Sequence, residues 1–347
     1  MTGLQGRVCI GLPVYNGQRY VGAAIESILT QTFGDLELII SDNASTDATG
    51  DICRAYAARD KRISYSRLDE NMGAIQNYER VYQLGGGQYF KWAAHDDLIA
   101  PTFIERCVEV LDQNPAAVLA YPKAEFIDEN GTFLKPYNVK LATDSEVAHE
   151  RFNAIANAPH KETHNFEIFG LMRRSATDLI PQQGGYAASD RVFLARLALY
   201  GKFIEVPEIL FLSRFHAEQS IHTLPTYMRE KRTWLNKIIG HGQLPPAEWF
   251  DHKYTGRITF PEWRLMWEYL ISVRYGWLNT RERAHCIGGA VRRQFTHGNW
   301  ARMVRDFLLA GDKVAARVAR SLRDSGTPQP LQPSPSPKPA AATKAAA

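Results

Sequence analysis

Cysteine is scarce in this sequence, and the few cysteines are not paired. Cys9, Cys53, Cys107 and Cys286 are the only four in 347 residues, and no two form a Cys-x-x-Cys motif. The first three lie inside apolar segments. This pattern excludes a disulfide framework and a cysteine zinc site, and it predicts free thiols in or near the core of a protein from a reducing compartment.

Long apolar runs and a secretion signal are also missing. The chain starts MTGLQGRVCIGLPVYNG, without a charged start, a long apolar run and a cleavage site. No segment reaches the roughly 18 uninterrupted apolar residues that a membrane helix needs. We therefore expect a cytoplasmic protein, with at most peripheral contact at the inner face of the cell membrane.

Charge is divided unevenly along a chain of ordinary globular composition. Residues 1–226 hold 21 basic and 28 acidic residues, whereas residues 227–323 hold 18 and 8. A Pro/Ser/Ala-rich segment follows, which cannot bury enough apolar surface to become ordered. The sequence thus predicts an α/β domain at 1–226, a basic helical extension at 227–323 and a disordered tail at 324–347.

Short apolar runs rich in β-branched residues alternate with helical periodicity over the first 125 residues, as in βαβ units of a doubly wound sheet. The expected strands are 7–12, 36–41, 63–67, 89–93 and 117–121. The expected helices are one that ends near residue 31, then 47–59, 73–84 and 101–113. Asp128-Glu129-Asn130-Gly131 predicts a hairpin turn. Beyond it we expect helices at 146–157 and 189–200 and strands at 166–172, 202–206 and 209–215.

Three polar clusters follow expected strands, at the edge where an open parallel sheet binds its ligands. They are PVYNG at 13–17, DNASTD at 42–47 and AHDD at 94–97. The first turn has no GxGxxG, which excludes an ordinary dinucleotide enzyme. The clusters therefore predict a different ligand at this edge.

Each cluster also has a purely structural interpretation. Ser45 or Asp47 could cap the next helix, and Asp96-Asp97 could do the same for the helix after Pro101. However, adjacent carboxylates repel each other unless a cation or a base pairs with them. Asp96-Asp97 is therefore a signal for Mg²⁺ or Mn²⁺, which prefer hard oxygen ligands and complete their shell with phosphates.

Together and in this order, the clusters resemble the family 2 glycosyltransferases, which have the GT-A fold. PVYNG, SDNASTD at 41–47, Asn71-Met72-Gly73 with Asn77, and AHDDLIAP at 94–101 carry the resemblance. It covers 7–125 well and continues more weakly to about 220. Ala94 stands where the family usually has the first acid of Asp-x-Asp, so Asp96 matches the second. The resemblance implies a nucleotide-sugar site that includes Pro13, Tyr15, Asn16, Asp42, Asn71, Gly73, Asp96 and Asp97.

The second half contains two further resemblances. Ala188-Ser189-Asp190 resembles the Glu-Asp element of the family, whose Asp is the catalytic base, although Ser189 could simply cap a helix and Asp190 favour its positive end. Ser213-Arg214-Phe215-His216 resembles the Arg-x-His element that reaches the diphosphate or the metal. The implied roles are Asp190 as base, Arg214 as a donor-binding residue, and His216 with Asp96 as metal ligands.

The resemblance implies metal-assisted, inverting transfer of a sugar from a nucleotide-diphosphate sugar to an acceptor hydroxyl. The acceptor would be a glycan or a lipid-linked sugar, in the synthesis of a cell-surface polysaccharide or glycolipid, with Mg²⁺ or Mn²⁺ as cofactor. One alternative is a nucleotide-sugar binding module or degenerate transferase, which Ala94 favours and Asp190 opposes. A sugar-phosphate nucleotidyltransferase would want a glycine- and arginine-rich first loop, which PVYNG is not.

The basic segment 227–323 leaves two interpretations open. Arg264, Trp267, Arg274 and Trp277 could form a helical face that rests on an anionic membrane, where lipid-linked acceptors lie. The segment could equally be a packed helical extension with solvated arginines. Nucleic acid is not an expected partner, because the sequence contains no recognisable nucleic-acid module.

Overall fold

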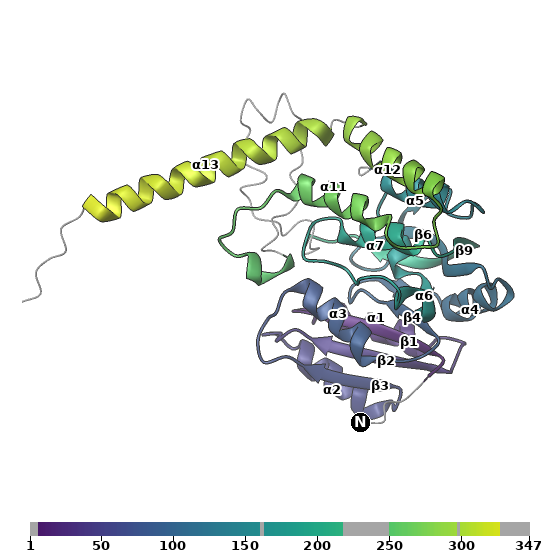
Figure 1. The fold of residues 1–347 in the computed structure, drawn as a ribbon. Helices are drawn as coiled ribbons and strands as arrows, with labels where there is room; N and C mark the ends of the chain where they lie inside the picture. The colour runs from purple at the N-terminus through teal and green to yellow at the C-terminus, as the bar shows by residue number, and fades with distance from the viewer. Residues whose placement is uncertain (1–5, 160–162, 218–249, 297–298, 327–347) are drawn as a thin grey trace, which may run out of the picture.

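The architecture was analysed in a computed structural model that describes residues 6–159, 163–217, 250–296 and 299–326. A single twisted sheet lies between two layers of helices, and further helices follow along the C-terminal part of the chain (Figure 1). None of the described helices is both long enough and apolar enough to cross a bilayer.

The N-terminal part is a parallel sheet built as the apolar periodicity predicts. Its strands are β1 (Val8–Val14), β2 (Leu36–Asp42), β3 (Ile63–Arg67) and β4 (Tyr89–Trp92). The connecting helices are α1 (Val21–Leu29), α2 (Thr49–Arg59) and α3 (Ala74–Leu84). β1 pairs in parallel with both β2 and β4, and the register places Val14 opposite Asp42. The carboxyl ends of these strands therefore meet at one edge.

The remaining strands make the sheet mixed. They are β5 (Leu98–Ile99), β6 (Ala117–Ile127), β7 (Phe133–Tyr137), β8 (Leu171–Arg173) and β9 (Lys202–Arg214). The helices between them are α4 (Phe103–Gln113), α5 (Ala148–Ala156), the 3-10 helix η1 (Phe166–Phe169), α6 (Arg174–Thr177) and α7 (Ser189–Leu197). The strand order is β3-β2-β1-β4-β8-β6-β9-β5, and β7 pairs with β6. β8 runs antiparallel to both β4 and β6, at the centre of the sheet.

Two apolar cores cover the two faces of the sheet. Because successive strand residues point to opposite faces, Cys9 belongs to the core beneath α3, α5 and α7, whereas Val8 and Ile10 belong to the core beneath α1 and α4. All four cysteines are buried and free, as the sequence predicts.

The structure corrects several sequence predictions. The expected strand 166–172 is the 3-10 helix η1 followed by the short strand β8, and the two strands expected between 202 and 215 are one irregular strand, β9. β5 was not expected. The turn at 128–131 connects β6 to β7 as predicted, and the sheet is mixed, as the resemblance to the GT-A fold implies.

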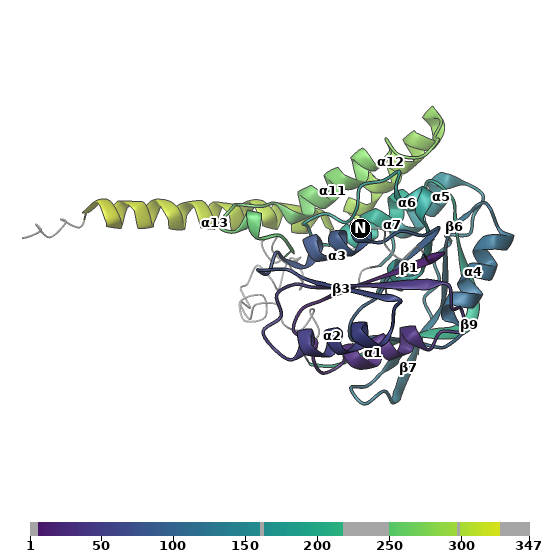
Figure 2. The same ribbon diagram turned by 90° about the horizontal axis from the view of Figure 1, so that it is seen from below.

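The described part of the C-terminal segment is helical, as expected. It contains η2 (His252–Tyr254), α11 (Pro261–Ser272), α12 (Thr280–Phe295) and α13 (Asn299–Gly326). α11 packs on α7 and α12 on α5, whereas most of α13 projects away from the body (Figures 1 and 2). The predicted boundary at 226/227 lies outside the described residues, as does the predicted tail beyond Gly326.

A buried ion pair connects α11 to the sheet domain. Arg196 Nη2 of α7 lies 2.5 Å from Glu268 Oε2 of α11, and their side chains are only 4% and 6% exposed. Arg196 Nε also donates to Ser272 Oγ, and Arg264 pairs with the other oxygen of Glu268. Neither side chain faces water, so the charges of Arg196 and Glu268 compensate each other.

Replacing Glu268→Ala should lower the free energy of unfolding by about 3–5 kcal/mol, because it leaves the Arg196 charge buried without its partner. Urea unfolding monitored by circular dichroism measures the loss. The matched control is Glu109→Ala, which breaks an exposed pair with Arg106 and should leave stability nearly unchanged. Equal stabilities of the two variants would contradict the role of Glu268 in fixing α11.

Candidate active site

The turn after β1 is joined to the loop after β2 by reciprocal hydrogen bonds. The backbone N–H of Asn16 donates to Ser45 Oγ (2.9 Å), the N–H of Thr46 donates to Asn16 Oδ1 (2.8 Å), and the N–H of Gly17 donates to Thr49 Oγ1 (2.8 Å). Asn16 has a left-handed backbone (φ 49°). Tyr15 is 43% exposed at this edge, which leaves its ring accessible to a flat ligand.

Pro13 is not in the turn where the sequence analysis placed it. β1 continues through Val14, so Pro13 is a buried strand residue paired with Ser41 of β2. The strand outlasts the expected end at residue 12 because β2 continues in register as far as Asp42. At the turn itself, a Cβ on Gly17 would lie 2.5 Å from His95 Cδ2, so glycine is what allows the loop after β4 to approach.

Asn43 holds three segments of the site together. Its Nδ2 donates to Asn71 Oδ1 (2.9 Å), its Oδ1 accepts from the N–H of Met72 (2.9 Å), and its own N–H donates to Val14 O (2.9 Å). Asn71 Oδ1 also accepts from the N–H of Gly73, which has a positive φ of 90°. The side chain of Asn43 is buried, so these contacts fix the Asn71-Met72-Gly73 loop beside the end of β1.

Asp42 is completely buried, and both of its carboxylate oxygens accept hydrogen bonds from neighbouring residues. Its Oδ1 accepts from the N–H of Ser45 (2.8 Å), and its Oδ2 accepts from the Tyr65 hydroxyl (2.9 Å) and lies 3.5 Å from Arg67 Nε. The carboxylate thereby orients the loop and places the half-exposed Arg67 beside it. A direct contact between Asp42 and a nucleotide stays a prediction.

Asp96 and His216 meet at the end of β4. Asp96 Oδ2 lies 3.0 Å from His216 Nε2, and the other ring nitrogen of His216, Nδ1, is buried without a hydrogen-bond partner among the described residues. Burial by itself would raise the pKa of Asp96, but the hydrogen bond with His216 and the nearby His95 outweigh it and lower this pKa. Asp96 is therefore held in its anionic form, and it is 17% exposed.

Asp97 and Arg214 complete this corner. The backbone N–H of Arg214 donates to Asp97 Oδ1 (2.9 Å), and Arg214 Nε donates to the Asp96 carbonyl (2.9 Å). Its Nη1 donates to the carbonyls of Asp128 and Glu129, so the buried guanidinium supports the backbone of the metal motif and of the β6–β7 turn. Burial, and then the charge of Asp96, raise the pKa of Asp97 above its usual range.

Asp190 lies in the first turn of α7, and its carboxylate is held by Asn165. Asn165 Nδ2 donates to Asp190 Oδ2 (2.9 Å), and Asn165 Oδ1 accepts from Arg191 Nε (3.1 Å). The buried Arg191 is fixed in turn by the Ala158 carbonyl. The N-cap residue of α7 is Ala188, with a φ of 61° and no capping side chain, so Ser189 is not a cap.

Tyr78 of α3 lies within electrostatic reach of three acidic groups. Burial raises the pKa of its hydroxyl, and the charges of Asp96, Asp97 and Asp190 raise it further. The three carboxylates therefore lie in the same region of the molecule, although Asp190 is 93 residues or more away from the other two in sequence. The predicted metal motif and the predicted base thus belong to one region of the fold.

The residues at this edge fit a divalent ion. Asp96 and His216 are separated by the distance of two ligands of one ion, and His216 has an orphaned ring nitrogen. The described residues contain no cluster of three or more acidic, histidine or cysteine ligands. Mg²⁺ and Mn²⁺ accept such small protein ligand sets when substrate phosphates supply the rest of the shell.

Comparison with known sequences decides the family. The model of the family described as "Glycosyl transferase family 2" matches residues 9–180. An uncharacterized glycosyltransferase of Rickettsia prowazekii is 30% identical over 237 residues, which cover 64% of this chain and 68% of that protein. The chain belongs to glycosyltransferase family 2. The resemblance inferred from the sequence motifs is thereby confirmed.

Other relatives place the family 2 domain in larger proteins and fix its fold. The chain spans about a third (32%) of an uncharacterized Rickettsia bellii glycosyltransferase, at 27% identity. The crystal structure of Staphylococcus aureus TarS 1–349 in complex with UDP-GlcNAc matches with a TM-score of 0.56 at 16% identity, over 84% of this chain and 73% of that one. The fold of this glycosyltransferase-family chain is GT-A, with a helical C-terminal region.

Several residues of the site were not foreseen. Asn43 was considered only as part of a loop, and Tyr78, Asn165 and Arg191 carried no sequence signal, because nothing in a single sequence shows which side chains an acid in another segment will meet. Asn43 belongs to the motif at 41–47, but that motif does not show that its side chain joins three segments.

Replacing Asn43→Ala should lower the free energy of unfolding by about 2–4 kcal/mol, because it leaves the buried N–H of Met72 and neighbouring acceptors without partners. Urea unfolding checks this. The control is Asn114→Ala, which removes an exposed hydrogen bond to Val110 O and should change stability by about 0.5 kcal/mol or less. If Asn43→Ala were no more destabilising than the control, the loops would not depend on Asn43.

Proposed function

We propose that this family 2 chain transfers a sugar from a nucleotide-diphosphate sugar to an acceptor hydroxyl, with inversion and with the help of a divalent ion. The observation that carries the proposal is that Asp96, held by His216, and Asp190, held by Asn165, lie in one region, where both act on the Tyr78 hydroxyl. Asp96 and Asp97 lie on the loop after β4, and Asp190 lies in the first turn of α7.

The donor would lie along the edge formed by the turn after β1 and the loops after β2 and β4. Tyr15 is exposed there to stack on a base, and Arg67 and the Asn71-Met72-Gly73 loop flank it. A relative in fold, TarS, was crystallised with UDP-GlcNAc, which supports a nucleotide-sugar donor for this chain as well. Asp96 and His216 would hold Mg²⁺ or Mn²⁺, which would neutralise the charge that develops on the leaving diphosphate.

Asp190 would act as the general base. Its carboxylate accepts a hydrogen bond from Asn165 and is only partly buried, so a free lone pair can face an acceptor hydroxyl. As the acceptor oxygen attacks the anomeric carbon, its proton passes to Asp190 and the nucleoside diphosphate leaves from the opposite side. Asn165 and Arg191 would keep the carboxylate directed at that proton. A single displacement of this kind inverts the anomeric configuration.

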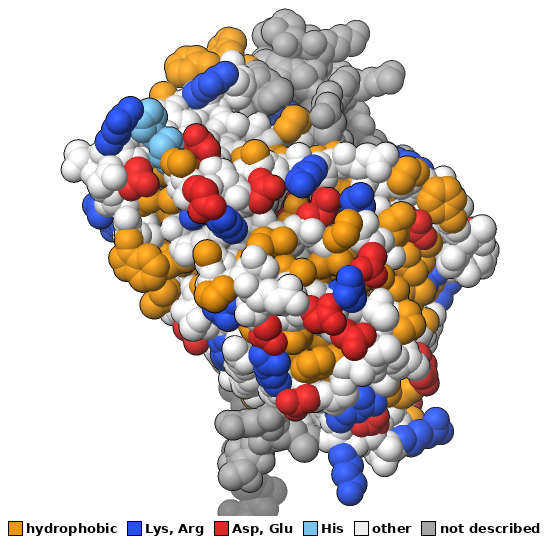
Figure 3. All heavy atoms as spheres, turned by 90° about the vertical axis from the view of Figure 1, so that its right-hand side faces the viewer, with side chains coloured by type: hydrophobic (Ala, Val, Ile, Leu, Met, Phe, Trp, Pro, Cys, Tyr) orange, Lys and Arg blue, Asp and Glu red, His pale blue; other side chains and the backbone are white. Residues whose placement is uncertain are grey.

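We further propose that α13 rests on an anionic membrane that carries a lipid-linked acceptor. Apolar side chains at helical spacing on α13 are about half exposed: Trp300, Val304, Phe307, Val314 and Val318. Trp267 and Trp277 are exposed on the neighbouring segments, and residues 227–323 hold 18 basic against 8 acidic residues. On the face drawn in Figure 3, acidic and basic side chains are scattered among apolar ones. Exposed apolar side chains that can enter the lipid surface, together with an excess of basic residues, favour binding to an anionic membrane. Such a place suits synthesis of a cell-surface polysaccharide or glycolipid.

Two variants test the role of the metal ligand and the role of the base separately. Asp96→Asn should reduce transfer about a thousandfold and weaken Mn²⁺-dependent nucleotide binding. Asp190→Asn should reduce transfer about 10²–10⁴-fold and leave nucleotide affinity within about threefold, because it acts on the transition state. Calorimetry with UDP and GDP measures binding, and turnover of UDP-glucose, UDP-N-acetylglucosamine and GDP-mannose measures activity.

Loss of nucleotide binding in Asp190→Asn, or wild-type transfer by it, would remove Asp190 from the role of base. Metal-dependent turnover that survives Asp96→Asn would remove the metal assignment. The anomeric configuration of the product, read by NMR, is an independent check, since retention is incompatible with single displacement.

The membrane contact predicts co-sedimentation of the full chain with vesicles that contain phosphatidylglycerol and not with phosphatidylcholine alone. Trp300→Ser with Phe307→Ser should weaken this binding by about tenfold or more, because two apolar anchors are lost. Phe133→Ser, at an equally exposed site on β7, is the matched control. Binding that the α13 variant does not weaken would leave the helix without this role.

A further inference from the structure

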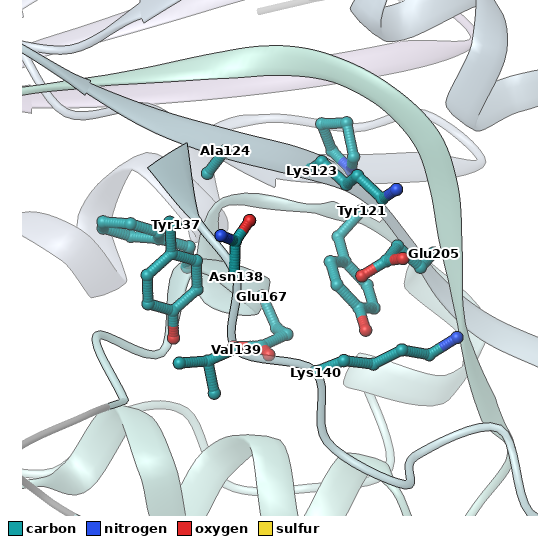
Figure 4. Close-up of a pocket in the computed structure, with 11 residues that line it drawn as sticks. Tyr121, Lys123, Ala124, Tyr137, Asn138, Val139, Lys140, Glu167 and Glu205 are labelled. Atoms are coloured by element: carbon teal, nitrogen blue, oxygen red, sulfur yellow. The ribbon is translucent and has the colours of Figure 1, made fainter. Parts of the chain in front are cut away.

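A cavity opens on the side of β6 that faces η1. It has a volume of about 250 Å³ and lies between β6, the segment after β7, η1 and β9 (Figure 4). Tyr137 and Tyr121 stand on opposite sides of the cavity, with the Glu167 side chain between them. Its polar lining includes Lys123, Asn138, Lys140 and Glu205. None of these residues has a part in the site described above.

One carboxylate oxygen of Glu167 lacks a hydrogen-bond donor among the described residues. This oxygen is Oε2, and the residue is only 3% exposed. Burial raises the pKa of Glu167 to about 6, and the charges of Glu205 and Asp190 act in the same direction. A buried carboxylate oxygen without a donor is costly to the fold. A ligand that donates a hydroxyl to this oxygen would remove that cost.

The cavity wall is covalently continuous with the residue that holds Asp190. Asn165, whose side chain donates to Asp190 Oδ2, directly precedes Phe166 and Glu167, and both of these line the cavity. Asn165 itself has a left-handed backbone (φ 53°) and directly precedes η1. A single residue therefore connects the cavity wall to Asp190.

We propose that this cavity binds one neutral sugar residue of the acceptor glycan, so that the neighbouring residue presents its hydroxyl to Asp190. The inference rests on the proposed transferase function. Aromatic rings offer faces to the apolar side of a sugar, and buried carboxylate and amide groups pair with its hydroxyls. The volume is slightly below the roughly 300–1,000 Å³ of sites for drug-sized ligands, which suits a single ring. Two carboxylates offset the two lysines of the lining, so the cavity has no excess of positive charge for a phosphate or nucleotide.

Saturation-transfer NMR on the full chain tests the proposal with four probes: the methyl glycosides of glucose, galactose, mannose and N-acetylglucosamine. At least one should bind, and Glu167→Gln should weaken its binding about tenfold, because a hydrogen bond to a charged acceptor is replaced by a neutral one. Tyr121→Phe, which removes only a hydroxyl from the lining, should weaken the same probe and keeps the test decisive if Glu167→Gln does not fold. Glu109→Gln, on the exposed face of α4, should bind like the wild type.

The proposal is overturned if no glycoside binds, or if neither Glu167→Gln nor Tyr121→Phe weakens the one that does. Preference for methyl glucosaminide, whose amine is charged, over all four neutral probes would assign an amine to the cavity and also overturn it. Calorimetry with UDP or GDP and Mn²⁺ on the same samples keeps the two hypotheses apart. Nucleotide binding without glycoside binding rejects the cavity assignment alone, whereas glycoside binding without nucleotide binding rejects the proposed function.

Discussion

The parallel pairing of β1 with β2 and β4 is the constraint on which the rest of the site depends. Parallel strands end at the same edge, so the turns after β1, β2 and β4 meet there whatever their individual sequences. Hydrogen bonds from buried amide side chains then fix these turns relative to one another. Asn43 joins three of the segments, and Asn77 Nδ2 donates to the carbonyl of Ser41 at the end of β2.

Several acidic side chains lie at that edge, and their negative charges must be compensated by nearby donors or cations. Asp42 is balanced by the N–H of Ser45 in its loop and by Arg67 and the Tyr65 hydroxyl on β3, while Asp96 relies on His216 and Asp97 on the backbone N–H of Arg214. The Arg214 guanidinium donates to the carbonyls of Asp96, Asp128 and Glu129. Each acid at this edge is thus compensated by partners from several segments.

The antiparallel strand β8 decides how the two halves of the site meet. It lies between β4 and β6 and brings η1, with Asn165 directly before it, next to the end of the parallel half. The buried pair of Arg196 and Glu268 attaches α11 behind α7, whose first turn carries Asp190. The helical region thereby supports the helix that carries Asp190, while the turns after β1, β2 and β4 form the rest of the candidate site.

The sequence by itself determined the local elements and the donor edge. Short apolar runs rich in β-branched residues located β1 to β4, and period-3.6 apolar patterns located α1 to α4, because a strand covered on both faces is apolar throughout whereas a helix buries one face. The motifs at 13–17, 41–47 and 94–97 followed, since the residues after a parallel strand share one edge. The sequence did not show that Pro13 stays inside β1, that 166–172 divides into η1 and β8, or that Tyr65 and Arg67 of β3 pair with Asp42. Nor could it show that Asn165 meets Asp190 or that Tyr78 lies within electrostatic reach of it. Strand extension, strand order and side-chain contacts between distant segments depend on packing of the whole chain, and only the tertiary structure decides them.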